Sequence, residues 1–266
     1  MGRLSGCVRR IDGPWGGRID GEAVVVSLAF SARSAAFTNG YRTIARLWRA
    51  DLCDFYEAWS EEREARCVVK ILRPDRRAYA PDRRRVVSEG ELLLSLTHPH
   101  IVRAYEVRKD PVPFIVLEAI GGSTLAGMIE RGPLAVRDLA RLATQISSAL
   151  AYLHRRGYAN VDLAPSNVVF DHGHARVLDL STVRHPRTGE TAESIDSFGL
   201  GSLLYQAATC RAPFGEGAAG THVAPSLKKN GRLLPATVSV VMRCLSAAPA
   251  DRPAVAEVAR VFAPLA

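Results

Sequence analysis

The sequence predicts an α+β protein of two lobes, with a β-rich first part and an α-helical second part. Up to about residue 120, short apolar runs alternate with polar turns, which is the pattern of strands. After that point, apolar side chains recur at helical spacing over longer stretches. Strands followed by helices are typical of α+β proteins, and two lobes leave room for a binding cleft between them. A chain of 266 residues is long enough to bury the core that such a fold needs.

The first part is expected to consist of an extension and a β-rich lobe. Residues 1–40 are rich in glycine and arginine and then in small apolar residues, and they are expected to be an N-terminal extension of unknown role. Residues 41–120 are expected to form the first lobe. Its β-type runs lie at residues 41–47, 55–59, 67–72, 101–107 and 113–117. One helix is expected between them, at residues 81–97, because Val86, Leu93 and Leu96 stand at near-helical spacing.

Residues 121–266 are expected to form the helical second lobe. Its clearest helix covers residues 139–154, where Leu142, Ile146 and Leu153 lie on one stripe and Gly157 follows as a C-terminal cap. A small hairpin is expected around His172-Gly173. The further helices are expected at residues 196–209, 238–246 and 254–262.

The composition excludes several classes of protein. Hydrophobic residues make up 47% of the chain, yet no apolar run is long enough to span a bilayer, so no membrane span is expected. The five cysteines are scattered without a C-x-x-C pair, which favours reduced thiols in the cytoplasm over a disulfide framework or a zinc site. The net charge is +8, from 35 basic and 27 acidic residues. Because no aromatic residues are interleaved with the basic ones, a solvated arginine-rich surface is favoured over a nucleic-acid partner.

The residues around position 165 indicate phosphate chemistry. Asp162, with Asn167 five residues later and Asp179 after the expected hairpin, offers the carboxylate and amide oxygens that hold Mg²⁺. Lys70, in an expected strand, is a candidate for the cation that phosphates require. Each residue alone also fits a simpler interpretation, such as an exposed strand lysine or a turn aspartate. The order of the surrounding segments is therefore needed to choose between these interpretations.

From about residue 41 to the C-terminus, the chain resembles eukaryotic-like bacterial serine/threonine protein kinases. The segments that carry the resemblance, in family order and near family spacing, are Val68-Val69-Lys70, Glu89, His98-Pro99-His100-Ile101-Val102, Leu117-Glu118-Ala119-Ile120-Gly121-Gly122, Tyr152-Leu153-His154, Asn160-Val161-Asp162 with Asn167, Asp179-Leu180-Ser181, Asp196-Ser197-Phe198-Gly199 and Ala250-Asp251-Arg252-Pro253. The resemblance implies the bilobal protein-kinase fold, with ATP as substrate and Mg²⁺ as cofactor.

The resemblance also implies roles for residues that bind the nucleotide. Lys70, paired with Glu89 nineteen residues later, would hold the α- and β-phosphates. Glu118 and Ile120 would bind adenine through their backbone groups at the hinge between the lobes.

Three further residues would carry the transfer itself. Asp162 would be the catalytic base, and Asn167 and Asp179 would hold Mg²⁺. The expected function is therefore an ATP-dependent phosphotransferase of the serine/threonine protein kinase type. The sequence names neither the protein substrate nor any partner protein.

The chain departs from the family pattern around the phosphates. The three glycine positions of the phosphate-covering loop fall on Trp48, Ala50 and Cys53, whose side chains hinder close approach of the backbone. The lysine usually found two residues after the catalytic aspartate is Ala164, and the arginine usually found before that aspartate is Val161. The missing lysine removes a positive charge from the transferring phosphate, worth about 2–4 kcal/mol if nothing replaces it. The missing arginine removes the cation that would dock a phosphorylated activation loop.

The activation segment is also reduced. Asp196 follows Asp179 by only seventeen residues, where the family places an activation loop, a peptide-docking stretch and an A-P-E motif. Ser181 stands where the family has the glycine of D-F-G. Arg252, which usually pairs with the glutamate of A-P-E, is expected to pair with Glu190 or Glu193 or to face water.

Two alternatives to an active protein kinase stay open. The lost glycines and docking stretch also fit a pseudokinase, a nucleotide-sensing or scaffolding module without transfer. The short segment after Asp179 also fits a kinase for a small molecule, because it leaves the acceptor side open. Binding of Mg-ATP, and transfer with and without Asp162, would distinguish these functions.

Overall fold

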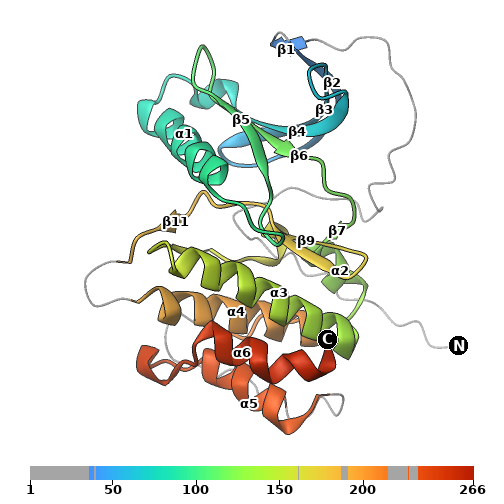
Figure 1. Cartoon of the computed structure of the whole chain (residues 1–266), viewed down its shortest axis with the longest axis vertical. Helices are drawn as coiled ribbons and strands as arrows, with labels where there is room; N and C mark the ends of the chain where they lie inside the picture. The colour runs from blue at the N-terminus through green and yellow to red at the C-terminus, as the bar shows by residue number, and fades with distance from the viewer. Residues whose placement is uncertain (1–35, 39, 161, 187–190, 215–226, 228–232) are drawn as a thin grey trace, which may run out of the picture.

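The computed structural model describes residues 36–38, 40–160, 162–186, 191–214, 227 and 233–266. Figure 1 shows a β-sheet with one long helix above a layered group of helices, so the predicted α+β class is confirmed. Within the described residues, no helix is long and apolar enough to cross a membrane. Most of the expected extension lies outside the described residues, which include only its strand at residues 36–38 and Gly40.

The upper part is an antiparallel sheet with the strand order β1-β2-β3-β4-β6-β5. The bounds are Ala36–Thr38 for β1, Tyr41–Arg49 for β2, Cys53–Ser60 for β3, Ala65–Leu72 for β4, Ala104–Arg108 for β5 and Phe114–Glu118 for β6. The central strand β4 reads A-R-C-V-V-K-I-L, a β-branched run that suits a strand paired on both sides. This central position places Lys70 deep in the sheet.

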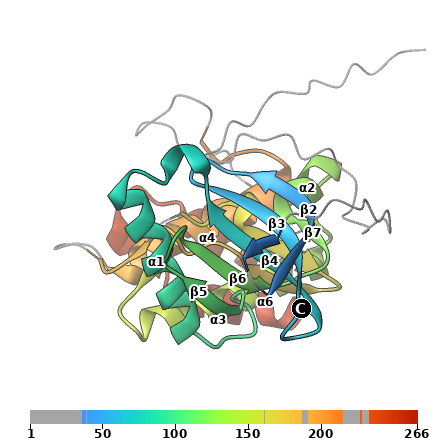
Figure 2. The ribbon, with the colours of Figure 1, turned by 90° about the horizontal axis from the view of Figure 1, so that it is seen from above.

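Helix α1, Ala80–Ser95, packs beside the sheet against β5 and β6 (Figure 2). Its buried face consists of Val86, Glu89, Gly90 and Leu93. A Cβ atom at Gly90 would lie 2.4 Å from Cγ2 of Val107, so only glycine allows the helix to approach β5 this closely. The close approach brings the neighbouring Glu89 to the sheet.

The lower part is built around helix α3, Val136–His154, whose apolar stripe is almost completely buried. The other helices are α2, Leu125–Arg131; α4, Ala192–Thr209; α5, Pro235–Cys244; and α6, Val255–Phe262. The sequence analysis did not predict α2, and it placed the start of α4 four residues too late. Thr191 caps α4 by accepting a hydrogen bond from the backbone N–H of Ser194.

Short strands line the lower part where it faces the sheet. They are β7, Ser123–Thr124; β8, Ala159–Asn160; β9, Val168–Asp171; β10, His174–Val177; and β11, Val183–Arg184. The expected hairpin is present as β9 and β10, with a turn in which His172 and Gly173 have positive φ angles of 45° and 84°. It ends two residues before Asp179 and so leads directly into the site.

The upper and lower parts are joined by one chain segment and by backbone hydrogen bonds between two others. The joining segment follows β6 and includes Gly122, which has φ 96° and where a Cβ atom would lie 2.6 Å from the carbonyl oxygen of Phe170. Between the two others, Val102 donates a backbone hydrogen bond to Val177, and Val177 donates one to His100. A continuous apolar core that includes Leu72, Ile115 and residues of all the α-helices runs through both parts.

Candidate active site

A buried cluster of three charged side chains lies where the sheet meets the lower part. The Nζ atom of Lys70 on β4 lies 2.7 Å from each carboxylate oxygen of Glu89 on α1. The same Nζ atom lies 3.3 Å from Oδ2 of Asp179, which follows β10. The three side chains are 4%, 1% and 7% exposed, respectively. The ion pair expected between Lys70 and Glu89 is therefore present, and Asp179 joins it from the other lobe.

The three groups of this cluster differ in how strongly their charged forms are stabilised. Burial opposes charging of Lys70, but Asp179 and Glu89 outweigh it and raise the lysine pKa, so the ammonium stays charged. Burial also works against ionisation of Asp179, yet the charge of Lys70 and the hydrogen bonds from Ser181 hold the pKa of Asp179 below its usual value. Burial raises the pKa of Glu89 to about 7, against the attraction of Lys70. Asp179 is therefore the more strongly ionised of the two carboxylates.

An aromatic ring of the β2–β3 hairpin lies next to Lys70, and a second ring stacks on the first. Phe55 pairs with Lys70 in the register of β3 and β4, and the lysine Nζ atom lies 5.5 Å from its ring centroid. Trp48 stacks on Phe55 with ring centroids 4.2 Å apart and planes 19° apart. One of the expected glycine positions thus carries an indole ring that packs over the ring next to the lysine.

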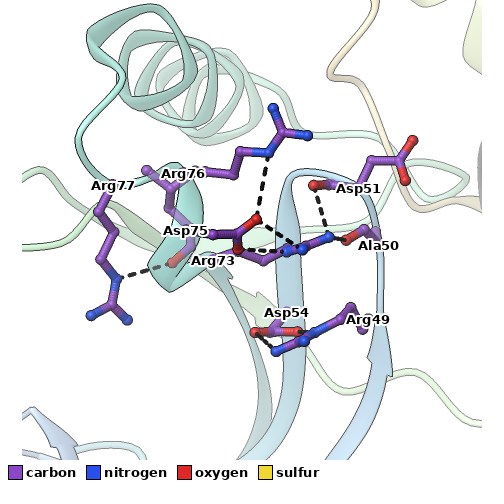
Figure 3. Close-up of polar contacts among 9 residues, drawn as sticks. Arg49, Ala50, Asp51, Asp54, Arg73, Asp75, Arg76 and Arg77 are labelled. Atoms are coloured by element: carbon purple, nitrogen blue, oxygen red, sulfur yellow. Dashed lines mark hydrogen bonds and ion pairs between the residues drawn. The ribbon is translucent and has the colours of Figure 1, made fainter.

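The loop between β2 and β3 is held in place by ion pairs and hydrogen bonds, as Figure 3 shows. Arg49 binds both carboxylate oxygens of Asp54, at 2.7 and 3.1 Å. Arg73 donates to the carbonyl oxygens of Ala50 and Asp51, both at 3.2 Å. The backbone N–H of Ala50 donates inside the loop, to the carbonyl of Cys53. In this arrangement the Ala50 amide is already bonded and is not free to face a phosphate.

The expected catalytic and metal-binding residues follow β8. Asn167, in a short 3₁₀ turn at Pro165–Asn167, donates from Nδ2 to the backbone carbonyl of Asp162 at 3.3 Å. The carbonyl of Asn167 accepts from the backbone N–H of Leu178 at 2.8 Å, which holds it beside Asp179. Burial first, and then the nearby charge of Asp179, raise the pKa of the Asp162 carboxyl group, while Arg85 opposes the rise. The structure thus brings Asp162, Asn167 and Asp179 together.

A buried acid–base pair supports the segment before Asp162. The Oδ2 atom of Asp196 on α4 is 2.6 Å from Nε2 of His154 and accepts the backbone N–H of Asn160 at 3.1 Å. Burial opposes charging of His154, but the hydrogen bond and charge of Asp196, together with Glu193, raise its pKa. The sequence analysis named Asp196 and His154 only within two family-like segments and gave neither a role. The apolar stripe of α3, which ends at His154, was the available signal.

Among the described residues, the partners of Arg252 do not include Glu193, one of the two glutamates that the sequence suggested. The Arg252 guanidinium donates to the carbonyl oxygens of Ser246 and Ser194, both at 2.9 Å, and stacks 4.8 Å from the ring centroid of Phe198. Glu193 instead accepts the backbone N–H of Val255 at the start of α6. Backbone carbonyls therefore take the place of the missing A-P-E carboxylate. Glu190 lies outside the described residues.

The segment after β6 offers one free backbone donor. The backbone N–H of Glu118 donates to the carbonyl of Arg103 at 2.9 Å, and its side chain accepts the N–H of Arg103 at 2.9 Å. Within the described residues, the backbone N–H of Ile120 has no hydrogen-bond partner. Of the two expected adenine-binding residues, Ile120 therefore has a donor available.

The donor set fits a hard cation. Asn167 and Asp179 supply an amide and a carboxylate, the oxygen ligands that Mg²⁺ takes together with water and phosphate oxygens. Among the described residues, no three His, Cys, Asp or Glu side chains are grouped to hold a metal ion. A bound Mg²⁺ would therefore depend on the nucleotide for the rest of its ligands.

One further cation reaches this site. Arg85 on α1, one helical turn before Glu89, donates to Oγ of Ser181 at 3.4 Å. No sequence signal singled it out, because it lies in a run of three arginines at positions 83–85. Its exposed side chain lies on the same helix face as Glu89.

Comparison with known proteins agrees with this geometry. Residues 51–194 match the family model of the protein kinase domain. The chain is 34% identical over 227 residues to the serine/threonine-protein kinase PkaA of Streptomyces coelicolor, which covers 73% of this chain and 42% of PkaA. It is 29% identical over 228 residues to the serine/threonine-protein kinase PrkC of Bacillus subtilis, covering 71% of this chain and 35% of PrkC. The chain thus spans less than half the length of either relative.

Solved structures show the same fold. The kinase domain of PknI from Mycobacterium tuberculosis superposes with a TM-score of 0.73 at 23% identity, over 89% of this chain and 99% of that domain. Together with the matched family model, this similarity shows that the chain belongs to the protein kinase domain family, with the eukaryotic-like bacterial serine/threonine kinases among its relatives.

Proposed function

We propose that this chain is an ATP-dependent phosphotransferase of the serine/threonine protein kinase type, with Asp162 as the catalytic base. The observation that carries the proposal is the convergence of Lys70, Glu89 and Asp179 in one buried cluster beside Asp162 and Asn167. Structural ion pairs alone do not require a second carboxylate, from the other lobe, to meet the same lysine. Phosphoryl transfer does, because it depends on positioned charge.

In the proposed reaction, Lys70 binds the α- and β-phosphates, and Glu89 and Asp179 keep its ammonium charged and oriented. Asn167 and Asp179 would hold Mg²⁺, which neutralises phosphate charge when bound. The acceptor hydroxyl oxygen forms a bond to the γ-phosphorus, and the bond from that phosphorus to the β–γ bridging oxygen breaks. ADP leaves with the electron pair, and the hydroxyl proton passes to the Asp162 carboxylate. The raised pKa of Asp162 makes it a stronger base for this proton.

Adenine recognition is assigned in the same proposal to the backbone at Glu118 and Ile120. The free N–H of Ile120 supports this assignment, since it can donate to an adenine ring nitrogen. A cytoplasmic location also belongs to the proposal, because the described cysteines are free thiols, which persist in a reducing compartment.

The test is phosphate transfer from γ-labelled ATP with Mg²⁺, to the chain itself and to a generic protein acceptor. Asp162→Asn keeps the size of the side chain but removes the base. The rate is expected to fall by about 10²–10⁴ with little change in Mg-ATP affinity. Asp138→Asn is the matched control, because it makes the same chemical change at a half-exposed position on α3. Equal incorporation by wild type and Asp162→Asn would refute the proposed role.

A second function, a pseudokinase that binds partners without transfer, is favoured by the β2–β3 hairpin. The stack of Trp48 on Phe55 and the bonded amide of Ala50 leave the phosphates with little backbone cover. Wild type that is stabilised by Mg-ATP but incorporates no label would support this function. Mg-ATP at a free concentration of 100 times its Kd stabilises the fold by about 2.7 kcal/mol, which a thermal melt detects.

A further inference from the structure

The proposed transfer requires a cationic side chain next to the γ-phosphate. The positions at which the family usually has such a side chain do not supply it here. Ala164 stands where the family usually has a lysine. Lys70 is already bonded to two carboxylates and is 4% exposed, so its charge is largely balanced before any phosphate binds. Apart from Mg²⁺, the γ-phosphate would then meet Asp162 and Asp179, and both carboxylates repel it.

Arg85 is placed to supply this charge. From α1 it reaches over the segment leading to β11, which Figure 1 shows beneath the helix, and donates to Ser181 two residues after Asp179. Ser181 in turn donates its backbone N–H to Oδ1 of Asp179 at 2.7 Å. The guanidinium therefore lies beside one proposed Mg²⁺ ligand.

Arg85 is also uncommitted, unlike the nearby Arg83. Arg83 is bonded to Asp110 and to the carbonyl oxygens of Lys109 and Pro111. Within the described part of the chain, Arg85 makes no ion pair, and its one hydrogen bond, to Ser181, is long at 3.4 Å. An exposed guanidinium with a single weak neutral partner, close to Asp179, is suited to bind an anion.

We propose that Arg85 binds the γ-phosphate of the nucleotide and takes the place of the missing lysine. The inference rests on the proposed function for the identity of the ligand. A guanidinium forms two parallel hydrogen bonds to phosphate oxygens, which suits a planar donor reaching in from α1. During transfer it stabilises the charge on the oxygens of the moving phosphoryl group, while the proton still passes from the acceptor to Asp162.

The test compares the affinities of Mg-ATP and Mg-ADP, measured by titration calorimetry on the full chain. Only ATP carries the γ-phosphate. Arg85→Ala is therefore expected to weaken Mg-ATP binding by about tenfold to a hundredfold and to leave Mg-ADP binding unchanged. Arg85→Lys is expected to restore part of the ATP affinity. Arg84→Ala is the matched control, because it removes an equal charge from the neighbouring exposed position.

The outcomes separate this inference from the proposed function. Arg85→Ala that changes ATP and ADP affinities equally, or that matches Arg84→Ala, overturns the role of Arg85 even if wild type transfers phosphate. If Arg85→Ala selectively loses affinity for ATP while the wild type transfers no phosphate, the role of Arg85 is supported and the kinase activity is refuted. A wild type that binds neither nucleotide overturns both.

Discussion

Replacing Lys70 by methionine removes the ammonium that faces the buried carboxylates of Glu89 and Asp179. At an effective dielectric constant of about 20, charges 2.7 Å apart attract by about 6 kcal/mol and charges 3.3 Å apart by about 5 kcal/mol. The cost of burying three charges offsets much of this attraction. Loss of one member of a buried pair typically costs about 3–5 kcal/mol, and we expect Lys70→Met to lower the free energy of unfolding by that amount.

The assay is denaturation in urea, with wild type, Lys70→Met and the double variant Lys70→Met/Glu89→Gln compared at equal m-values. The double variant removes one of the two uncompensated carboxylates. It is therefore expected to be about 1–2 kcal/mol more stable than Lys70→Met. Lys70→Met within about 1 kcal/mol of wild type, or a double variant less stable than the single one, would refute this account of the cluster.

The pH dependence gives a second check on the same variant. Burial already raises the pKa of Glu89 to about 7 while Lys70 opposes it, so removing Lys70 raises that pKa further. A carboxyl group with a raised folded-state pKa gains stability as the pH falls through that pKa. The deficit of Lys70→Met relative to wild type is therefore expected to shrink as the pH is lowered toward 7, by about 1.4 kcal/mol per unit of further pKa rise.

Two further predictions concern α1 and the support beneath Asp162. Gly90→Ala places a methyl group 2.4 Å from Val107, so it is expected to lower the free energy of unfolding, measured by urea denaturation, by about 1–3 kcal/mol. Adding Val107→Ala to the same chain is expected to recover most of this loss. No recovery would mean that the helix does not depend on this contact. The pKa of His154 is raised above 6.5, so wild-type stability is expected to fall as the pH rises from 6.5 through that pKa. His154→Gln should show a flatter profile over this range, and identical profiles for both proteins would contradict the ion pair with Asp196.

The sequence predicted the candidate site residues because their types, and the order of the surrounding segments, resemble those of protein kinases. Lys70 stands in a β-branched run, and Glu89 lies on a helix with apolar residues at regular spacing. Asp162 and Asn167 lie in a polar stretch between an apolar helix and a hairpin. Local patterns of this kind predict strands, helices and turns, and hence the α+β class and the expected hairpin of β9 and β10.

Other parts of the site could not be predicted, because they depend on packing between distant segments. The hydrogen bonds from Arg73 to the β2–β3 loop join residues that are more than twenty positions apart in the sequence. The choice of backbone carbonyls by Arg252 depends on how α4 meets the turn before α6. Arg85 looks identical to its two arginine neighbours in sequence, and only the rotation of α1 directs it, and not Arg83, toward Ser181.

By itself, then, the sequence determined the α+β class and supplied a set of candidate groups for phosphate and magnesium, because periodicity and residue chemistry are local properties. The tertiary structure alone decided how the charge is shared. It placed two carboxylates on one buried lysine, stacked Trp48 on the ring next to that lysine and left Arg85 uncommitted. Electrostatic energies depend on distance and burial, and folding sets both.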